Sequence, residues 1–130
     1  MNIDDLIDAV IDREGGFSAN KADRGGATRY GITEAVARAE GYTGDMRQFP
    51  RAIAVAIYRR LYWTRPSFDR IAEQAPSVAA ELFDTGVNMG PAVAAAFLQR
   101  ALNALNRGAS YYSDIAIDGR IGDRTLAALT

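Results

Sequence analysis

The chain has 130 residues, with 15 basic and 16 acidic side chains, a net charge of −1, and neither cysteine nor histidine. This length suits one domain with a core of its own, and the missing residue types exclude disulfides, thiol chemistry and the serine–histidine and cysteine–histidine catalytic arrangements. They also remove the ligands that zinc prefers, and the scattered arginines form no concentrated positive face, so we expect no metal, no cofactor and no nucleic-acid partner.

The N-terminal segment MNIDDLIDAVIDRE is acidic and amphipathic, whereas a secretory signal needs a basic start and an uninterrupted apolar run. The longest apolar runs, such as Val93 to Leu98, are too short to cross a bilayer. We therefore expect a monomeric protein that is made in the cytoplasm without a classical signal peptide and does not insert into membranes.

The first predicted element is a helix over residues 3–14. Its apolar residues recur at helical spacing, Asn2 can cap its start, and Gly15 and Gly16 can end it in a left-handed turn. From Gly15 to Gly31 the pattern breaks into glycines and short polar residues, which predicts a long loop or a small β-hairpin. Thr33 then caps a second, short helix.

Three further helices follow. Pro50 precedes one that runs into Tyr62 and Trp63, Pro76 starts another, and a third follows Gly90 and Pro91. A looser segment begins after residue 106 and leads to IDGRIGDRTLAAL, which we interpret as a tail module. The pattern is typical of a mainly α protein with one hairpin-like insertion.

Glu14 is the first candidate for chemistry. It continues the apolar face of the first helix and lies in the last turn, so burial and the helix dipole would both favour its protonated form. A protonated carboxyl group can act as a general acid, and Gly15 and Gly16 leave space for a substrate beside it. The alternative is that Glu14 only closes the helix through an ion pair with Arg59 or Arg60.

Asp23 and Thr28 lie in the loop that follows. A carboxylate and a hydroxyl that face a protonated acid could hold a water molecule for attack on an acetal carbon, as in glycoside hydrolysis. The alternative is turn chemistry, because Asp before Arg-Gly-Gly is an ordinary turn residue.

The stretch EGGFSANKADRGGATRYGIT resembles the signature of glycoside hydrolase family 108, bacterial and phage lysozymes that read EGG followed by D-x-GG-x-T-x-YGIT. LYW at 61–63 and FDTGVNMGPAVAAAFLQRALN at 83–103 are similar to later family motifs, and DGRIGDRTLAAL resembles the start of a peptidoglycan-binding region. The resemblance implies a lysozyme-like catalytic domain over residues 1–106, mainly α with a small β-hairpin near the active site. Residues 107–130 would begin a peptidoglycan-binding segment.

The resemblance also implies a reaction, hydrolysis of the β-1,4 bond between N-acetylmuramic acid and N-acetylglucosamine in peptidoglycan glycan strands. Glu14 would protonate the leaving oxygen, and Asp23 with Thr28 would orient water or stabilise the transition state. A protein without a signal would reach the cell wall or periplasm through a holin-type pore or another assisted route, as a prophage endolysin does.

Aromatic side chains and one amide are candidates for binding sugar. Tyr30, Tyr62 and Trp63 could pack against pyranose rings, with core packing as the alternative, and Trp63 is expected to be exposed in a groove. Asn88 could bind an N-acetyl group, whereas Asp84, one helical turn away, is expected to have a structural role.

Two other hypotheses about the function stay open. A lytic transglycosylase also uses one glutamate, and it would release anhydro-muramyl ends. A peptidoglycan-binding or secretion-associated protein could use the same fold without catalysis.

Overall fold

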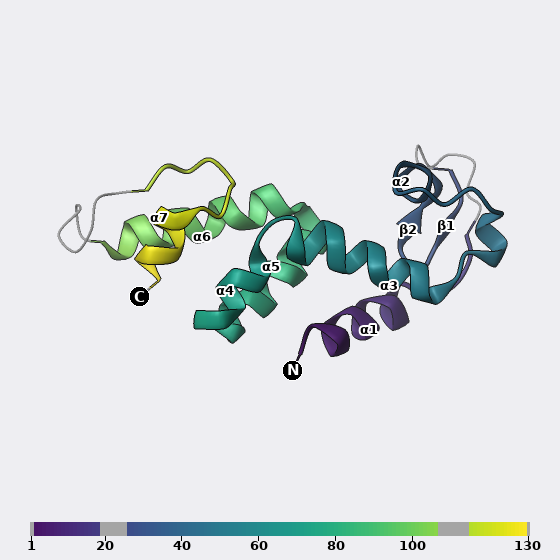
Figure 1. Ribbon diagram of the computed structural model, residues 1–130, viewed down its shortest axis with the longest axis horizontal. Coiled ribbons are helices and arrows are strands. Elements are labelled where there is room, and N and C mark those ends of the chain that lie inside the picture. The colour runs from purple at the N-terminus through teal and green to yellow at the C-terminus, as the bar shows by residue number, and fades with distance from the viewer. Residues whose placement is uncertain (1, 19–25, 107–114, 130) are drawn as a thin grey trace. The chain divides into compact units, whose positions relative to one another are not determined.

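The computed structural model describes residues 2–18, 26–106 and 115–129 (Figure 1). Its helices are α1 (Ile3–Glu14), α2 (Glu34–Ala39), α3 (Arg51–Arg59), α4 (Phe68–Gln74), α5 (Pro76–Met89), α6 (Pro91–Leu105) and α7 (Asp123–Ala128). A 3-10 helix, η1 (Met46–Gln48), and a π-helical turn, η2 (Arg60–Thr64), flank α3. The predicted mainly α fold class is confirmed.

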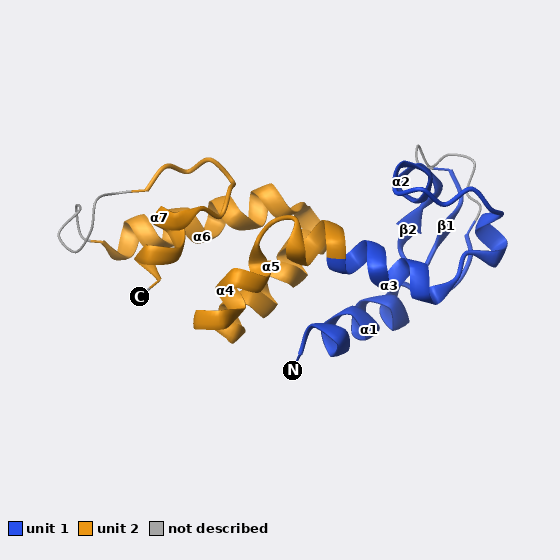
Figure 2. Ribbon diagram, viewed as in Figure 1, with its two compact units in different colours: residues 1–59 blue, residues 60–130 orange. Residues whose placement is uncertain are grey.

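The chain divides into two compact units, residues 1–59 and 60–130, here called unit 1 and unit 2 (Figure 2). Unit 1 holds α1, α2, η1, α3 and a two-stranded antiparallel hairpin of β1 (Thr28–Arg29) and β2 (Ile32–Thr33). Unit 2 holds η2 and α4 to α7.

The core of unit 1 is the packing of α1 against α3. The α1 side chains that are buried are those at the predicted helical spacing, Ile7, Val10 and Ile11, and α3 buries Ala54, Ile57 and Tyr58. The helix begins as the sequence predicts, because the Asn2 side chain accepts a hydrogen bond from the Asp5 N–H. It ends at Gly15 as predicted, with a positive φ of 78°, but the ψ of −153° lies outside the left-handed helical region.

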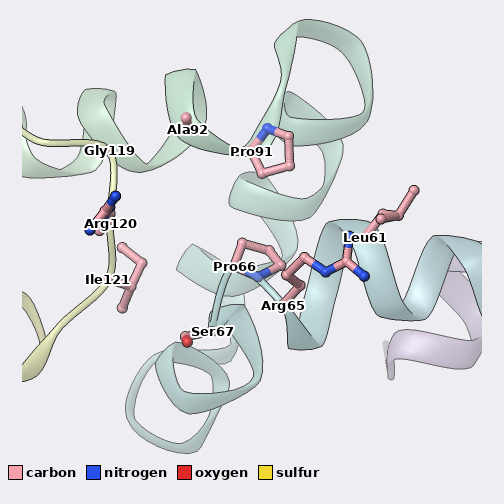
Figure 3. Close-up of a pocket in the computed structure, with 9 residues that line it drawn as sticks. All are labelled: Leu61, Arg65, Pro66, Ser67, Pro91, Ala92, Gly119, Arg120 and Ile121. Carbon is pink, nitrogen blue, oxygen red and sulfur yellow. The ribbon is translucent and has the colours of Figure 1, made fainter. Parts of the chain in front are cut away.

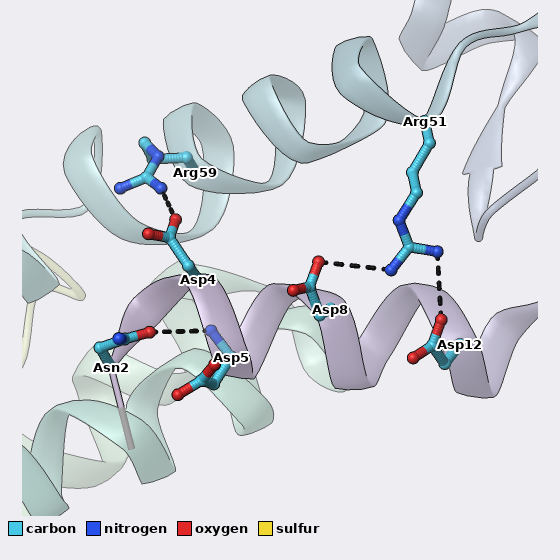
Figure 4. Close-up of polar contacts among 7 residues, drawn as sticks. All are labelled: Asn2, Asp4, Asp5, Asp8, Asp12, Arg51 and Arg59. Carbon is cyan, nitrogen blue, oxygen red and sulfur yellow. Dashed lines mark hydrogen bonds and ion pairs between the residues drawn. The ribbon is translucent and has the colours of Figure 1, made fainter.

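Ion pairs line the outside of the same two helices (Figure 4). Arg51 of α3 reaches Asp8 at 3.3 Å and Asp12 at 3.1 Å, and Arg59 pairs with Asp4. The Asp12 carboxylate, followed by that of Asp8, raises the pKa of Arg51. Since these side chains are exposed, the pairs orient α3 on α1 more than they stabilise it.

Unit 2 is built on α5, which packs against α4 and α6. The predicted helices at Pro76 and Pro91 are confirmed, with Pro in the first turn of each. The helix α4 was not predicted, because seven residues give too little periodicity and Ser67, at φ 64°, provides no side-chain cap.

The described part of the tail, residues 115–129, is tied to α6. Asn103 donates to the Ile115 carbonyl and accepts from its N–H, both at 2.9 Å, and the Gln99 side chain bonds to Asp118, Gly119, Arg120 and Thr125. The boundary predicted at residue 107 falls outside the described residues and stays a prediction, as does the interpretation of the tail as a peptidoglycan-binding segment. None of the described helices is long and apolar enough to cross a membrane.

Candidate functional site

The candidate site of unit 1 begins where α1 ends. The Gly15 N–H closes the helix on the Ile11 carbonyl at 2.9 Å, and the Gly15 carbonyl accepts a hydrogen bond from the Tyr30 N–H at 2.9 Å. The turn of the β1–β2 hairpin is therefore fastened to the residue that follows Glu14.

The hairpin is anchored at its base as well. Ser18 and Thr28 exchange two backbone hydrogen bonds of 2.7 Å, and Thr28 pairs with Thr33 across the hairpin. The Thr33 side chain accepts from the Val36 N–H at 3.2 Å and caps α2, as the sequence predicts. These hydrogen bonds fix the position of the Thr28 backbone.

Gly31 brings three elements together. It has a φ of 80°, and a Cβ atom there would lie 2.3 Å from the Tyr58 hydroxyl oxygen and 2.9 Å from Glu14 Cγ. The Tyr58 hydroxyl donates to the Tyr30 carbonyl at 2.7 Å. Only glycine fits this position, so the hairpin turn, the Glu14 side chain and α3 meet at one point.

The Glu14 side chain is 41 % exposed, and its carboxylate lies 3.8 Å from Arg13 Nε. The expected burial is wrong, because the helix ends at this turn and the atoms of Glu14 that lie closest to Gly31 are Cβ and Cγ. Its ion-pair partner is Arg13, whereas Arg59, one of the partners considered, pairs with Asp4. Glu14 thus combines a fixed stem with a carboxyl group that a ligand can reach.

The structure describes one of the other two predicted catalytic residues, Thr28, whose catalytic role stays a prediction. Thr28 is half-buried on β1, in the hairpin that is bonded to the end of α1. Asp23 lies outside the described residues, so its role stays a prediction. The described residues contain no group of three or more side chains able to hold a metal ion.

Tyr30 is half-buried with a positive φ of 55°. The Arg29 guanidinium lies 4.9 Å from the centre of its ring and donates to its hydroxyl group at 3.1 Å. One face of Tyr30 is therefore occupied by a cation, and the predicted contact with sugar stays a prediction.

The candidates in unit 2 have a different environment. Trp63, in η2, is 9 % exposed and its ring packs edge to face against Phe83, with centroids 6.3 Å apart. The expected exposure of Trp63 is wrong, because Phe83 of α5 lies against its ring. Its role as a sugar platform stays a prediction that this burial does not favour.

Tyr62, beside Trp63, is half-buried, and burial raises the pKa of its phenol group. Asn88 and Asp84 are both exposed on α5, so Asn88 can reach a ligand in solution. Their roles stay predictions.

Unit 2 also contains a pocket of about 530 Å³ (Figure 3). It is lined by Leu61, residues 65–67, Pro91 and Ala92, and residues 119–121 of the tail. None of the predicted site residues lines it.

Comparison with known proteins decides the family. Residues 7–90 match the model of the family described as Glycosyl hydrolase 108. The chain belongs to this family. The structure of SagA from Brucella abortus is similar to this glycosyl hydrolase with a TM-score of 0.71 and 29 % sequence identity, over 98 % of this chain and 67 % of SagA. No curated protein matches the chain significantly.

Membership of the glycosyl hydrolase 108 family makes the chain a glycoside hydrolase of the lysozyme type that acts on peptidoglycan. The family match covers Glu14, Thr28 and the hairpin as well as η2 to α5, and it stops at Gly90. The helix α6 and the tail lie beyond it.

Sequence reasoning missed Gly31 and Tyr58, which hold the Glu14 side chain in place. The YG pair of the family-like motif marks Gly31, but no pattern in the sequence links it to Tyr58, which looks like one more core residue of α3. Arg29 was also missed, because a single arginine in a polar loop carries no local signal.

Proposed function

We propose that this glycoside hydrolase is a muramidase, which cleaves the β-1,4 bond between N-acetylmuramic acid and N-acetylglucosamine with Glu14 as the general acid. The observation that supports it is the environment of Glu14. Its stem lies against Gly31, its side chain is 41 % exposed, and it is in the last turn of α1. A general acid needs both a fixed position and access to the leaving oxygen.

Asp23 and Thr28 complete the proposed reaction. After Glu14 has protonated the leaving group, Asp23 would orient a water molecule or stabilise the positive charge that develops on the sugar ring, helped by the Thr28 hydroxyl group. Thr28 is suited to this task because its backbone is paired with Ser18 on one side and with Thr33 on the other.

The test is the digestion of purified peptidoglycan by the full chain and by Glu14→Gln, followed by mass spectrometry of the released fragments. We expect reducing-end muramic acid products from the wild type and a loss of rate of about 10²- to 10⁴-fold in the variant. Asp12→Asn is the matched control, because it also changes a carboxylate to an amide in the last turns of α1 but removes only an exposed ion pair with Arg51.

Two results would contradict the proposal. Anhydro-muramyl ends in place of reducing ends would identify a lytic transglycosylase. Glu14 would then still be the acid, but no water molecule would attack the sugar. Equal rates for Glu14→Gln and Asp12→Asn would show that Glu14 is not the acid.

A further inference from the structure

A surface pocket lies beside the segment that directly follows Glu14. Phe17 and residues 43–47 are parts of the lining of a pocket of about 510 Å³ in unit 1, a size within the usual range for small ligands. Phe17 is 39 % exposed, and the Arg47 guanidinium lies 5.8 Å from the centre of its ring. An exposed aromatic ring beside polar groups is suited to the apolar face of a sugar ring.

The acidic groups of this pocket are already engaged. Glu34 pairs with Arg38 at 2.8 Å, and the Asp45 carboxylate accepts the Arg47 N–H at 2.8 Å as the cap of η1. Arg38 is further held by the carbonyls of Tyr42 and Gly44. The Glu34–Arg38 pair therefore serves the fold of the loop.

Two arginines at the pocket, Arg47 and Arg29, form no ion pair within the part of the chain that the structure describes. Arg29 donates to the Arg47 carbonyl, and its Nε atom is buried without a hydrogen-bond partner. The pocket lining and Arg29 together carry three guanidinium groups and two carboxylates, which is one net positive charge. Carboxylates are among the groups that guanidinium binds best.

We propose that this pocket binds the acidic side chain of a muramyl residue, and that Arg47 donates hydrogen bonds to its carboxylate. The inference rests on the proposed muramidase function. Of the two sugars in the glycan strand, only N-acetylmuramic acid carries a carboxyl group, which is free on its lactyl ether or extended by a stem peptide with carboxylates of its own. Arg29 holds the Arg47 backbone in place and adds positive charge behind the pocket.

The test uses three probes that contain no bond for a muramidase to cleave, titrated into the full chain and followed by amide chemical shifts. The first is the disaccharide N-acetylglucosaminyl-N-acetylmuramic acid with a free lactyl carboxylate, the second is the same disaccharide with its stem tetrapeptide, and the third is neutral chitobiose. Binding of these probes does not depend on catalysis by Glu14. The binding proposal can therefore be disproved while Glu14 remains the proposed acid, and the role of Glu14 can be disproved while the binding proposal holds.

Arg47→Gln is the informative variant, because it removes the guanidinium but keeps the carbonyl that Arg29 binds. We expect its affinity for an acidic disaccharide to fall about five- to tenfold, the loss typical of one exposed hydrogen bond to a charged group, with chitobiose unaffected. Weaker binding of the first probe alone would assign the site to the lactyl carboxylate, and weaker binding of the tetrapeptide probe alone would assign it to the stem peptide. Weaker binding of both would show that the pocket accepts a carboxylate from either. Arg124→Gln, an exposed arginine of unit 2, is the charge-matched control and should change none of the three affinities.

Three results would overturn the inference. They are equal weakening of chitobiose binding in Arg47→Gln, unchanged affinity for both acidic probes, and no measurable binding of either acidic probe to the wild type.

Discussion

Gln99 in unit 2 and Glu14 in unit 1 both lie on helices next to irregular backbone. Gln99 is 1 % exposed, and its amide makes four hydrogen bonds to the tail, to Asp118, Gly119, Arg120 and Thr125. Glu14 is 41 % exposed, and only the stem of its side chain is fixed. A polar side chain whose hydrogen-bonding capacity is used up inside the fold serves stability, whereas one that is held by its stem and open at its tip is available for chemistry.

The largest effect is expected from Gly31→Ala. A methyl group at this position would clash with the Tyr58 hydroxyl and with Glu14 Cγ, in a backbone conformation that alanine rarely adopts. We expect a loss of about 2–4 kcal/mol in the free energy of unfolding and a loss of peptidoglycan cleavage greater than the fraction unfolded explains. Urea denaturation and initial rates of cleavage measure the two effects.

Gly41→Ala is the matched control for Gly31→Ala. Gly41 also has a positive φ, 100°, but a Cβ atom there would meet nothing within 4 Å. It should lose about 1 kcal/mol through backbone strain and keep its activity. Equal losses of activity in the two variants would mean that the contact with Glu14 does not position the acid.

Gln99→Leu tests whether the buried amide of unit 2 serves stability and not cleavage. It removes a buried amide and leaves the Gly119 N–H and the Arg120 carbonyl without this partner. We expect a loss of about 2–3 kcal/mol in stability, with cleavage per folded molecule unchanged below the melting temperature. Thermal unfolding and rates at low temperature separate the two quantities.

Arg100→Ala, an exposed change at the next position of α6, should alter stability by no more than about 0.5 kcal/mol. A fall in cleavage per folded molecule in Gln99→Leu alone would show that the tail contributes to the active site, and the contrast between the two units would then be wrong.

A smaller effect is expected from Tyr58→Phe. It removes the hydrogen bond to the Tyr30 carbonyl and keeps the ring in the core of unit 1. We expect a loss of about 1 kcal/mol in stability and a rate several-fold lower, because the hairpin turn that holds Glu14 loses a support. Tyr42→Phe, which removes a more exposed bond to the Asp45 carbonyl, should cost less stability. An unchanged rate in Tyr58→Phe would show that Gly31 and the Gly15–Tyr30 bond suffice.

The comparison also explains what the sequence could predict. The helix α1 and both of its caps were predicted because spacing, Asn2 and Gly15 are local signals. The helices that begin at Pro76 and Pro91 were predicted for the same reason. The family-like motif predicted Glu14 as the acid, which stays a prediction, and the class of enzyme was confirmed by the family match.

The environment of the site could not be predicted, because it depends on contacts between distant residues. The apolar pattern of α1 predicts which side of the helix is buried. It does not predict that the Glu14 side chain, on the same side, remains 41 % exposed. Trp63 was expected in a groove because a turn follows it, but Phe83 of α5, twenty residues on, lies against its ring. The contact of Gly31 with Tyr58 likewise joins the hairpin to α3.

The smallest effect is a pH dependence in the tail of unit 2. The hydrogen bonds that the Asp118 carboxylate accepts from the Arg120 N–H and then from Gln99 lower its pKa below the ordinary value of 3.8. A carboxylate with a lowered pKa in the folded state stabilises the protein above its unfolded pKa, and this contribution is lost as the pH falls through the folded pKa. We therefore expect the difference in melting temperature between the wild type and Asp118→Asn to be constant above about pH 5 and to shrink below pH 4.

Asp123→Asn provides the comparison, since the Asp123 side chain is 94 % exposed and its carboxylate pairs only with Arg70, at 3.3 Å, among the described residues. Its melting temperature should follow that of the wild type closely, because an exposed ion pair contributes little. A constant difference between the wild type and Asp118→Asn from neutral pH to pH 3 would mean that Asp118 does not hold the tail through its charge. The tail would then be held on α6 by the neutral amides of Gln99 and Asn103, which do not titrate. Unit 2 would use uncharged hydrogen bonds for stability, whereas unit 1 places a carboxyl group where a ligand can reach it.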